Sequence, residues 1–530
     1  MGKPYDVVII GAGHNGLVSG AYLAQAGKSV LALERRDVIG GAAVTEELWP
    51  GYSINTASYV MSLLQPKIML DLKLKSHGLE VIEPPPLVQL FPDGRHLTFW
   101  GAPERMAAEF AKFCPEDREA YVRYRAHLTV LAPTVRNLMW SVPIDPTSRK
   151  PSEMAATLRF LWKNRGAIRN FYDLFDLFTM SAYDYLGRWF KSETAKLALG
   201  FYAAGGGGGN ASFRTPGTAF ALTRSLLRDH STAAGGPGFV KGGMGSISKA
   251  IAAAGGAHGM EVRTGAKVAS VIVKDGRAVG VELETGETVS AKVVVANANA
   301  RTTFLQLVPK TALPAGFVAH IAQYQAKSTV FKVHLALDGL PTVPGFAERS
   351  LGFDYPIQLR IAPSVDSIEE SYALAQAGRI TERPFLTAMT PSVLDPTLAP
   401  PGHHVMSIFG GHVPNVPRGS SWDDKREDLY ESAIDTLAEY MPDVRQRIVH
   451  HQTLTPLDYE RVFDLPGGHL QHGEMSLNQM FFSRPAPHFA AHRSPVAGLY
   501  ICGASAHPGG GVTGIPGHNA ASVILKDRAV

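Results

Sequence analysis

Cysteine is scarce in this sequence, which contains only two in 530 residues, Cys114 and Cys502. The two lie far apart and form no C-x-x-C pair, so neither a disulfide framework nor a dithiol redox centre is indicated. We expect both thiols to be buried and structural. We also do not expect the protein to be an efficient NAD(P)H:disulfide reductase.

Long apolar runs and dense blocks of basic residues are absent as well. No uninterrupted apolar run reaches the roughly eighteen residues that a membrane-spanning helix needs, and no export signal precedes the first predicted strand. With a net charge of only +4, nucleic acid is not an expected partner. These absences favour a cytoplasmic protein, soluble or peripheral to a membrane, and leave open whether it forms a homo-oligomer.

The composition that remains is that of a globular chain, with 45% hydrophobic and 18% charged residues. A length of 530 residues exceeds what one hydrophobic core usually organises. No internal repeat divides the chain. Two domains, or one two-domain unit, are therefore expected.

The N-terminal stretch YDVVIIGAGHNGLVSGAYLAQAGKSVLALERRD predicts a strand over 5–10, a helix over 14–25 and a second strand over 29–33. Gly11, Gly13 and Gly16 form G-x-G-x-x-G at the end of the first strand, where the glycines allow a tight turn, a close approach of phosphate and close helix packing. Glu34 ends the second strand, where a carboxylate can hold ribose hydroxyls and would repel a 2′-phosphate. This pattern indicates a dinucleotide site and disfavours NADP.

The next segment, VIGGAAVTEE, indicates which dinucleotide binds. Gly40 and Gly41 resemble the Gly-Gly pair that follows the acidic residue in glutathione-reductase-like flavoproteins. The resemblance implies that the pair passes close to FAD. An NAD-only dehydrogenase does not need such a segment.

The middle of the chain predicts a small antiparallel meander within residues 261–296, with turns at Asp275-Gly276 and Thr285-Gly286. An apolar strand over 292–296 is expected to rejoin the parallel sheet. In the flavoproteins just named, the backbone near the position of Val268 meets the adenine. The Gly-rich GPGFVKGGMGSISKAIAAAGG opens a helix but lacks the spacing of a second nucleotide fold.

The C-terminal GLYICGASAHPGGGVTGIPGHNAASVIL predicts a strand, a Gly-rich turn and a helix that starts near Val512. We expect the backbone of Gly509 to Gly511 to lie against the flavin ring. The positive end of the following helix would stabilise negative charge at flavin N1. The chain would therefore close the FAD site almost five hundred residues after opening it.

Two intervening regions differ in their sequence patterns. Residues 100–235 have a mainly helical pattern, and residues 325–460 have several strand candidates and a helix. We expect an α/β fold with a discontinuous, Rossmann-type FAD-binding domain of the glutathione-reductase kind and an inserted α+β substrate domain. The FAD-binding domain would comprise residues 1–99, 236–324 and 461–530. The substrate domain would comprise residues 100–235 and 325–460.

Several motifs together resemble the phytoene-desaturase and carotenoid-isomerase superfamily: IGGAAVTEE, GGMGSISKAI, VVVANANA, GGHLQHGEMSLNQMFFSRP and CGASAHPGGGVTGIPGHNAA. Within it, the chain is most similar to the branch of pyridine nucleotide-disulphide oxidoreductase domain-containing protein 2. The resemblance covers nearly the whole length and implies an FAD-dependent oxidoreductase. One departure is Gly503-Ala504, which stands where other flavoproteins often carry Gly-Asp near the ribityl chain.

The residues expected at the cofactor are Gly11, Gly13, His14, Asn15, Gly16, Glu34, Arg35, Gly40, Gly41, Ala42, Val268, Asn297, Gly503, Gly510, Gly511 and Val512. His507 is the leading candidate for a catalytic side chain, because it lies in the closing motif. The alternative, a histidine that fixes its loop by bonding to backbone, is at least as well supported. His472, Gln479 and Arg484 are weaker candidates. No metal site is expected, since the pairs His403-His404 and His450-His451 have no third ligand at a suitable spacing.

Three functions remain open. The first is FAD-dependent dehydrogenation or desaturation of a small apolar, polyene or lipid-like substrate, with hydride passing to flavin N5 and on to oxygen, a quinone or another acceptor. The second is redox-neutral isomerisation of a polyene by reduced FAD, and the third is a non-enzymatic flavin-fold protein acting through protein partners. The aromatic, basic stretch over 158–178 either contacts a membrane surface or buries its aromatic face within the substrate domain.

Overall fold

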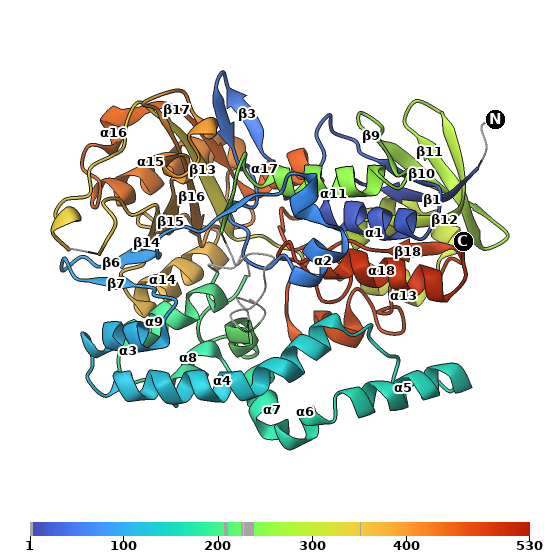
Figure 1. Cartoon of the computed structure of the whole chain (residues 1–530), viewed down its shortest axis with the longest axis horizontal. Helices are drawn as coiled ribbons and strands as arrows, with labels where there is room; N and C mark the ends of the chain where they lie inside the picture. The colour runs from blue at the N-terminus through green and yellow to red at the C-terminus, as the bar shows by residue number, and fades with distance from the viewer. Residues whose placement is uncertain (1–3, 206–209, 224–225, 227–237, 350) are drawn as a thin grey trace.

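The computed structural model describes residues 4–205, 210–223, 226, 238–349 and 351–530. Two seven-stranded sheets form two bodies side by side, and a layer of helices lies below them in Figure 1. None of the helices in the described ranges is both long and apolar enough to cross a membrane.

The first sheet is centred on β1 (Tyr5–Ile10), whose last four residues are buried. Its strand order is β10-β11-β12-β1-β2-β9, with β18 paired to β12. Strands β1, β2, β9, β18 and the end of β12 run parallel. The bounds are β2 Val30–Leu33, β9 Glu261–Arg263, β10 Val268–Lys274, β11 Arg277–Leu283, β12 Thr288–Ala296 and β18 Leu499–Ile501. Buried parallel strands of this kind need helices on both faces.

Strand β12 differs from the sequence prediction. The meander and the apolar strand were expected as separate elements, but one continuous strand, Thr288–Ala296, serves both. Its first residues pair antiparallel with β11, and its later residues pair parallel with β1. Strand β9, expected within the meander, instead extends the parallel sheet beside β2.

Three helices cover this sheet, α1 (His14–Gln25), α11 (Gly245–Gly256) and α18 (Ile515–Lys526). Close packing of α1 needs Gly16, because a Cβ there would lie 2.4 Å from the Gly11 carbonyl oxygen. The predicted start of α18 near Val512 was wrong. Val512 and Gly514 have φ values of +56° and +75°, which a right-handed helix does not contain, so the helix begins at Ile515.

The second sheet has the order β17-β13-β16-β15-β14-β6-β7. Central β13 (Val330–Leu337) is buried throughout and pairs antiparallel with β16 and β17. The other bounds are β6 Val88–Leu90, β7 His96–Thr98, β14 Gln358–Ile361, β15 Phe385–Met389, β16 His404–Gly411 and β17 Ile448–Leu454. Strands β6 and β7 lie within residues 1–99, which were predicted to belong to the FAD-binding domain, but they pair in the second sheet. We propose the predicted domain division with these two strands moved to the substrate domain.

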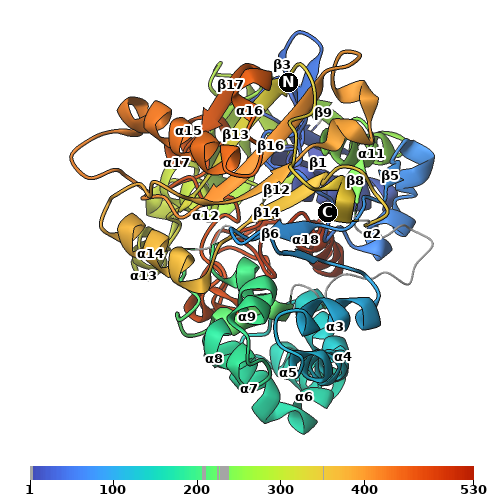
Figure 2. The ribbon, with the colours of Figure 1, turned by 90° about the vertical axis from the view of Figure 1, so that its left-hand side faces the viewer.

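The helical layer at the bottom of Figures 1 and 2 comes from residues 103–200. Its helices are α3 Pro103–Ala111, α4 Asp117–Trp140, α5 Pro151–Lys163, α6 Gly166–Arg169, α7 Phe171–Thr179, α8 Ala182–Gly187 and α9 Glu193–Gly200. Phe110, Leu131 and Phe190 are among the side chains that give it a core. Both views place α5–α7 farthest from the sheets.

The remaining strands and α-helices connect or cover these bodies. They are β3 Glu46–Trp49, β4 Tyr52–Ile54, β5 Val81–Ile82, β8 Phe239–Val240, α2 Pro66–Asp71, α12 Ala300–Thr302, α13 Ala315–Ala322, α14 Val365–Gln376, α15 Trp422–Ala438, α16 Val444–Arg447 and α17 Pro456–Phe463. In the second body, Trp422, Leu429 and Leu437 place one face of α15 in the core that includes β13.

One sequence expectation about burial needs correction, and one open alternative can now be compared with the structure. Cys502 is buried as expected, but Cys114 is only half-buried, and its Sγ donates to Glu116 Oε2 at 3.2 Å. Of the two alternatives for the 158–178 stretch, burial of the aromatic face fits Phe178, which packs on the helical core, but not Trp162, Phe171 and Phe175, which are each more than half exposed. An apolar period along a helix marks a face, but it does not say whether another element covers that face.

Candidate functional site: a dinucleotide cradle

The carboxylate of Glu34 is fixed at the end of β2, beside the Gly-rich turn. Its Oε2 accepts a hydrogen bond from the Ala12 N–H at 2.9 Å, and its Oε1 accepts one from the Arg36 N–H at 3.0 Å. Glu34 is buried. Gly11, which precedes Ala12 in the turn, has a φ of +92°. The turn and the acidic residue that the sequence paired are therefore in direct contact.

The N-terminus of α1 fits an anionic group. No side chain caps this helix, and the buried His14 Nε2 and Asn15 Oδ1 have no hydrogen-bond partner among the described residues. A Cβ at Gly13 would lie 2.6 Å from Asn297 Nδ2, so a larger residue would fill the cradle. The uncapped helix end, the helix dipole and the orphaned His14 Nε2, which can carry a hydrogen, together match a pyrophosphate.

The Gly-Gly segment lies against the same turn. The Gly40 N–H donates to the Ala12 carbonyl at 2.9 Å, and the His14 N–H donates to the Gly40 carbonyl at 3.3 Å. Gly40 and Gly41 both have positive φ values, +118° and +57°. The Ala42 carbonyl in turn accepts from the Ser58 N–H at 2.8 Å, which ties residues 55–59 to the cradle.

The two arginines after Glu34 have different surroundings. Arg35, the one chosen from the sequence, donates to the Arg461 and Val462 carbonyls at the end of α17. Arg36 forms an ion pair with Glu46 at 2.5 Å, while its second terminal nitrogen, Nη1, is buried without a hydrogen-bond partner among the described residues. We propose Arg36 as a cofactor ligand that the sequence reasoning missed. The signal, a second basic residue two positions after Glu34, was present.

The other two parts of the chain meet the turn where expected. The Glu34 N–H donates to Arg263 O and the Ala266 N–H donates to Glu34 O, both at 2.8 Å, so the chain leading to Val268 runs beside Glu34. The Asn297 N–H donates to Ile10 O at 2.9 Å. Gly503 approaches Asn297 so closely that a Cβ would lie 2.3 Å from its carbonyl oxygen.

The Gly-rich C-terminal turn packs tightly against residues from elsewhere in the chain. A Cβ at Gly510 would lie 2.8 Å from Gln471 Cα, and one at Gly511 would lie 2.9 Å from Leu63 Cδ1. Val512 is buried beside them. Whether this backbone also meets the flavin stays a prediction.

His507 is bound to backbone in this structure. It is 2% exposed, and its Nε2 lies 2.9 Å from the Leu138 carbonyl near the end of α4, so Nε2–H donates. Burial lowers the pKa of His507 to about 3, which keeps the ring neutral at neutral pH. This geometry favours the loop-fixing alternative that the sequence left open.

Arg484 is a buried clamp. Its guanidinium donates to the carbonyls of Gln471, Glu474, Gln479 and Ala504 at 2.7–3.1 Å. Gln479, also buried, exchanges hydrogen bonds with the backbone of Gln325. These two weaker candidates therefore hold together the segment that packs on the closing turn. The third, His472, is half-buried, and its buried Nδ1 is unpartnered in the described structure.

Lys332, on β13, is a buried amine that the sequence reasoning did not single out. It is fully buried, its Nζ donates to the Asn55 carbonyl at 2.9 Å, and it lies 4.7 Å from the centre of the Tyr59 ring. Burial lowers the pKa of Lys332 well below its usual range. His334, two residues on, is likewise buried, with its pKa lowered by burial and by Lys332. The only signal in the sequence was one lysine within an otherwise apolar strand.

A metal centre has no support in the described ranges, where no group of three His, Cys, Asp or Glu side chains could hold an ion. The histidine pairs have other contacts. His403 Nδ1 lies 2.6 Å from the Tyr52 hydroxyl, His450 stacks on Trp49, and His451 stacks on Tyr430.

Comparisons with known proteins agree with this geometry. Residues 16–517 match the family model described as flavin containing amine oxidoreductase. The chain is 36% identical over 551 residues to a rat protein named pyridine nucleotide-disulfide oxidoreductase domain-containing protein 2, covering 99% of this chain and 94% of the relative.

Two bacterial relatives are more distant. A protein of Castellaniella defragrans that is named as one of the subunits of limonene dehydrogenase is 29% identical, with 100% of this chain and 96% of the relative covered. A lycopene-forming phytoene desaturase of Pseudescherichia vulneris is 25% identical, with 98% and 99% covered. The solved structure of cyclohexylamine oxidase from Brevibacterium oxydans superposes with a TM-score of 0.58 at 18% identity, with 100% of both chains covered.

Proposed function

The chain belongs to the family of flavin-containing amine oxidoreductases, and within it we propose that this protein dehydrogenates an uncharged apolar substrate of the polyene, terpene or lipid-like class. The protein is an FAD-dependent oxidoreductase. The predicted family resemblance is therefore confirmed, and the alternative of a non-enzymatic flavin-fold protein is not supported. When bound, FAD supplies the acceptor for a hydride.

The surroundings of Lys332 carry the proposal of an uncharged substrate. Tyr59, which its Nζ faces, packs with Ile357 and Met389 and lies 5.7 Å from the Phe409 ring. Among the described residues no carboxylate pairs with Lys332. An ammonium substrate would meet a buried amine and apolar walls without a counter-charge, and burying its charge there is costly. A hydrocarbon has no charge to bury and avoids this cost.

The proposed role of Lys332 is to hold and move a proton. Burial lowers the pKa of Lys332 well below its usual range, and in this proposal the uncharged Nζ accepts the proton that a dehydrogenation releases. Its position, bonded to the 55–59 segment that Ala42 holds against the cradle, supports this role. His507 acts as a positioning residue, which ties the closing turn to α4.

The relatives' names support the substrate class. One name refers to a limonene dehydrogenase and another to a phytoene desaturase, and both denote hydrocarbon substrates. We propose that oxygen, a quinone or another small acceptor then reoxidises the protein, and that the protein meets its substrate at a membrane surface.

Anaerobic reduction of the bound flavin by a panel of compounds tests the proposal. Polyenes and terpenes should bleach the flavin absorbance, whereas primary amines of similar size should not. Rapid bleaching by amines alone would overturn the apolar assignment. Isomerisation of a polyene by the pre-reduced protein without net electron transfer would instead favour the isomerase.

Lys332→Met should slow flavin reduction by about 10²–10⁴-fold, the usual contribution of a positioned acid–base group. It should leave the flavin bound, because Lys332 lies outside the Gly-rich turn. Lys249→Met, at an exposed position on α11, is the matched control. Unchanged reduction in Lys332→Met over a full pH profile would remove the proposed proton role.

A further inference from the structure

Helices α5–α7 present apolar side chains to solvent. Trp162 is 71% exposed, Ile168 75% and Tyr172 81%. The others, each more than half exposed, are Met154, Leu158, Leu161, Phe171 and Phe175. We call these eight residues the apolar arm. Figures 1 and 2 place its helices at the edge of the molecule, remote from both sheets. Large apolar side chains exposed in such number on neighbouring helices mark a docking site.

The charge around the apolar arm has one predominant sign. Between residues 149 and 178 the acidic residues are Glu153, Asp173 and Asp176, whereas the basic residues are Arg149, Lys150, Arg159, Lys163, Arg165 and Arg169. Apart from a 3.6 Å pair between Lys150 and Glu153, none of these cations forms an ion pair with a described carboxylate. Arg165 instead lies over the Trp162 ring at 4.6 Å, so cation and aromatic ring share one surface.

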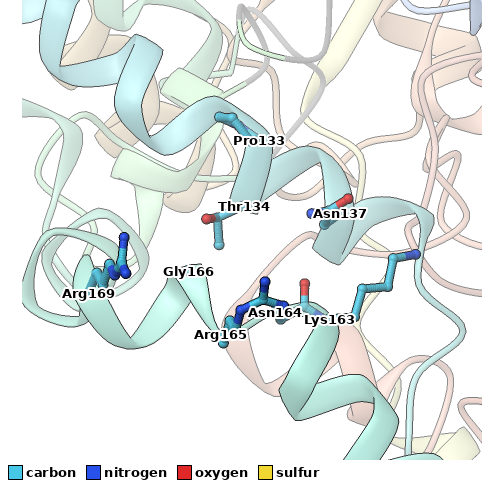
Figure 3. A pocket seen from close by; sticks show the side chains of 8 residues that line it. All are labelled: Pro133, Thr134, Asn137, Lys163, Asn164, Arg165, Gly166 and Arg169. Carbon is cyan, nitrogen blue, oxygen red and sulfur yellow. The ribbon is translucent and has the colours of Figure 1, made fainter.

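A cavity of about 390 Å³ opens where α4 passes the junction of α5 and α6 (Figure 3). Lys163, Arg165 and Arg169 line one side, and Thr134 and Asn137 of α4 line the other. Asn164, also in the lining, is buried, and its Oδ1 has no hydrogen-bond partner in the described ranges. Three cations suit an anionic phosphate, and the buried free acceptor suits a hydroxyl group on the headgroup that this phosphate joins.

We propose that this face docks on an anionic membrane, with a phospholipid headgroup phosphate in the cavity and the apolar arm in the headgroup–acyl boundary. Aromatic and aliphatic side chains bordered by lysine and arginine are what such a boundary recognises. A symmetric dimer through the same face would bring two sets of like charges together, which disfavours a second copy. The inference rests on the proposed function only for the reason why the protein docks, which is that an apolar substrate resides in the bilayer.

Co-sedimentation of the holoprotein with vesicles tests the docking directly. Vesicles of phosphatidylcholine with phosphatidylglycerol should pellet the protein, those of phosphatidylcholine alone should pellet it weakly, and high salt should release it. Lys163→Gln/Arg165→Gln/Arg169→Gln should lower the partition coefficient about a hundredfold, because each cation near an anionic surface contributes roughly a factor of five. Trp162→Ser/Ile168→Ser/Tyr172→Ser should lower it with both kinds of vesicle.

Two control variants carry substitutions at exposed sites in the first body. Lys249→Gln/Lys274→Gln is the control for the loss of positive charge, and Leu70→Ser is the control for the loss of exposed apolar side chains. Both should bind as the wild type does. Flavin reduction by a detergent-dispersed substrate should be unchanged in all variants, which separates a failure of docking from a failure of the proposed function. Equal binding of the triple-cation variant and wild type would overturn the proposal. So would a dimer that the Ser variant dissociates, or cation-dependent binding of inorganic phosphate without vesicle binding.

Discussion

Single buried charged side chains organise the backbone around the cofactor cradle. Glu34 accepts from two backbone N–H groups, one in the Gly-rich turn and one just beyond β2. Arg484 does the converse and donates to four carbonyls. In both cases the desolvation of a charge is offset by charge-assisted hydrogen bonds, so the side chain has one geometry.

Glu34→Ala should weaken FAD retention about ten- to a hundredfold. The change removes charge-assisted hydrogen bonds, each worth about 1.5–3 kcal/mol, both to the turn and to the ribose that we expect there. Flavin release on dilution, followed by fluorescence, measures the effect. Glu104→Gln, exposed on α3, serves as control. Full flavin occupancy in a folded Glu34→Ala protein would show that Glu34 is not the ribose ligand.

At the scale of elements, the cradle depends on two helices that cross with almost no space between them. A Cβ at Gly517 on α18 would lie 2.2 Å from the Asn15 carbonyl oxygen on α1. The position and direction of the α1 N-terminus, which faces the expected pyrophosphate, are therefore set partly by a helix from the C-terminal segment.

Gly517→Ala should lower the free energy of unfolding by about 1–3 kcal/mol, the usual cost of overpacking, and should also loosen the flavin. Denaturant unfolding with and without added FAD measures both effects. Gly256→Ala, at the end of α11, is a suitable control because nothing lies within 4 Å of the added Cβ. Equal stability of the two variants would mean that the crossing relaxes without cost.

What the sequence predicts at this scale depends on how local the signal is. The bounds of β1 and α1 followed from Gly11 and Gly16, because the turn and the close packing that these glycines permit are local. The start of α18 was missed because Val512 has a positive φ, which a β-branched residue rarely adopts and which no local pattern predicted. Lys332 was missed for a similar reason: its burial needs β16, β17 and the 55–59 segment around it.

At the scale of the whole molecule, many histidines are buried without charge. Burial lowers the pKa values of His14, His412, His469, His472, His492 and His507 to about 3 or 4, from 6.5. Below pH 6.5 the unfolded chain then binds more protons than the folded protein. Stability is therefore lost as the pH falls from about 6.5 towards 3.

Each such histidine should lower the free energy of unfolding by about 1.4 kcal/mol per pH unit in this window. Denaturant midpoints at pH 7 and pH 5 measure the loss. His492→Asn, which keeps a donor for the Ile501 carbonyl, should flatten the slope, whereas the exposed His258→Asn should not. Equal midpoints at the two pH values would contradict the assignment of neutral buried histidines.

The distribution of thiols over the molecule predicts poor disulfide reductase activity. Cys502 is buried at the end of β18, where burial raises its pKa, and Cys114 lies between α3 and α4, so no dithiol can form at the flavin. Stopped-flow mixing with NADH or NADPH should bleach the flavin only slowly. Rapid, saturable bleaching at micromolar nucleotide would require a nicotinamide site in addition to the cradle.

The order of strands in the first sheet also governs when the protein can acquire its flavin during synthesis. Strand β12 pairs with β1 from the N-terminal segment and with β18 from the C-terminal segment. At about 5–20 residues per second, a ribosome needs roughly 25–100 seconds to extend the chain from Ile10 to Leu499. Throughout that time the nascent chain has an incomplete sheet and a helix α1 without its partner α18. We therefore expect flavin incorporation to be post-translational and chaperones to hold the unfinished sheet.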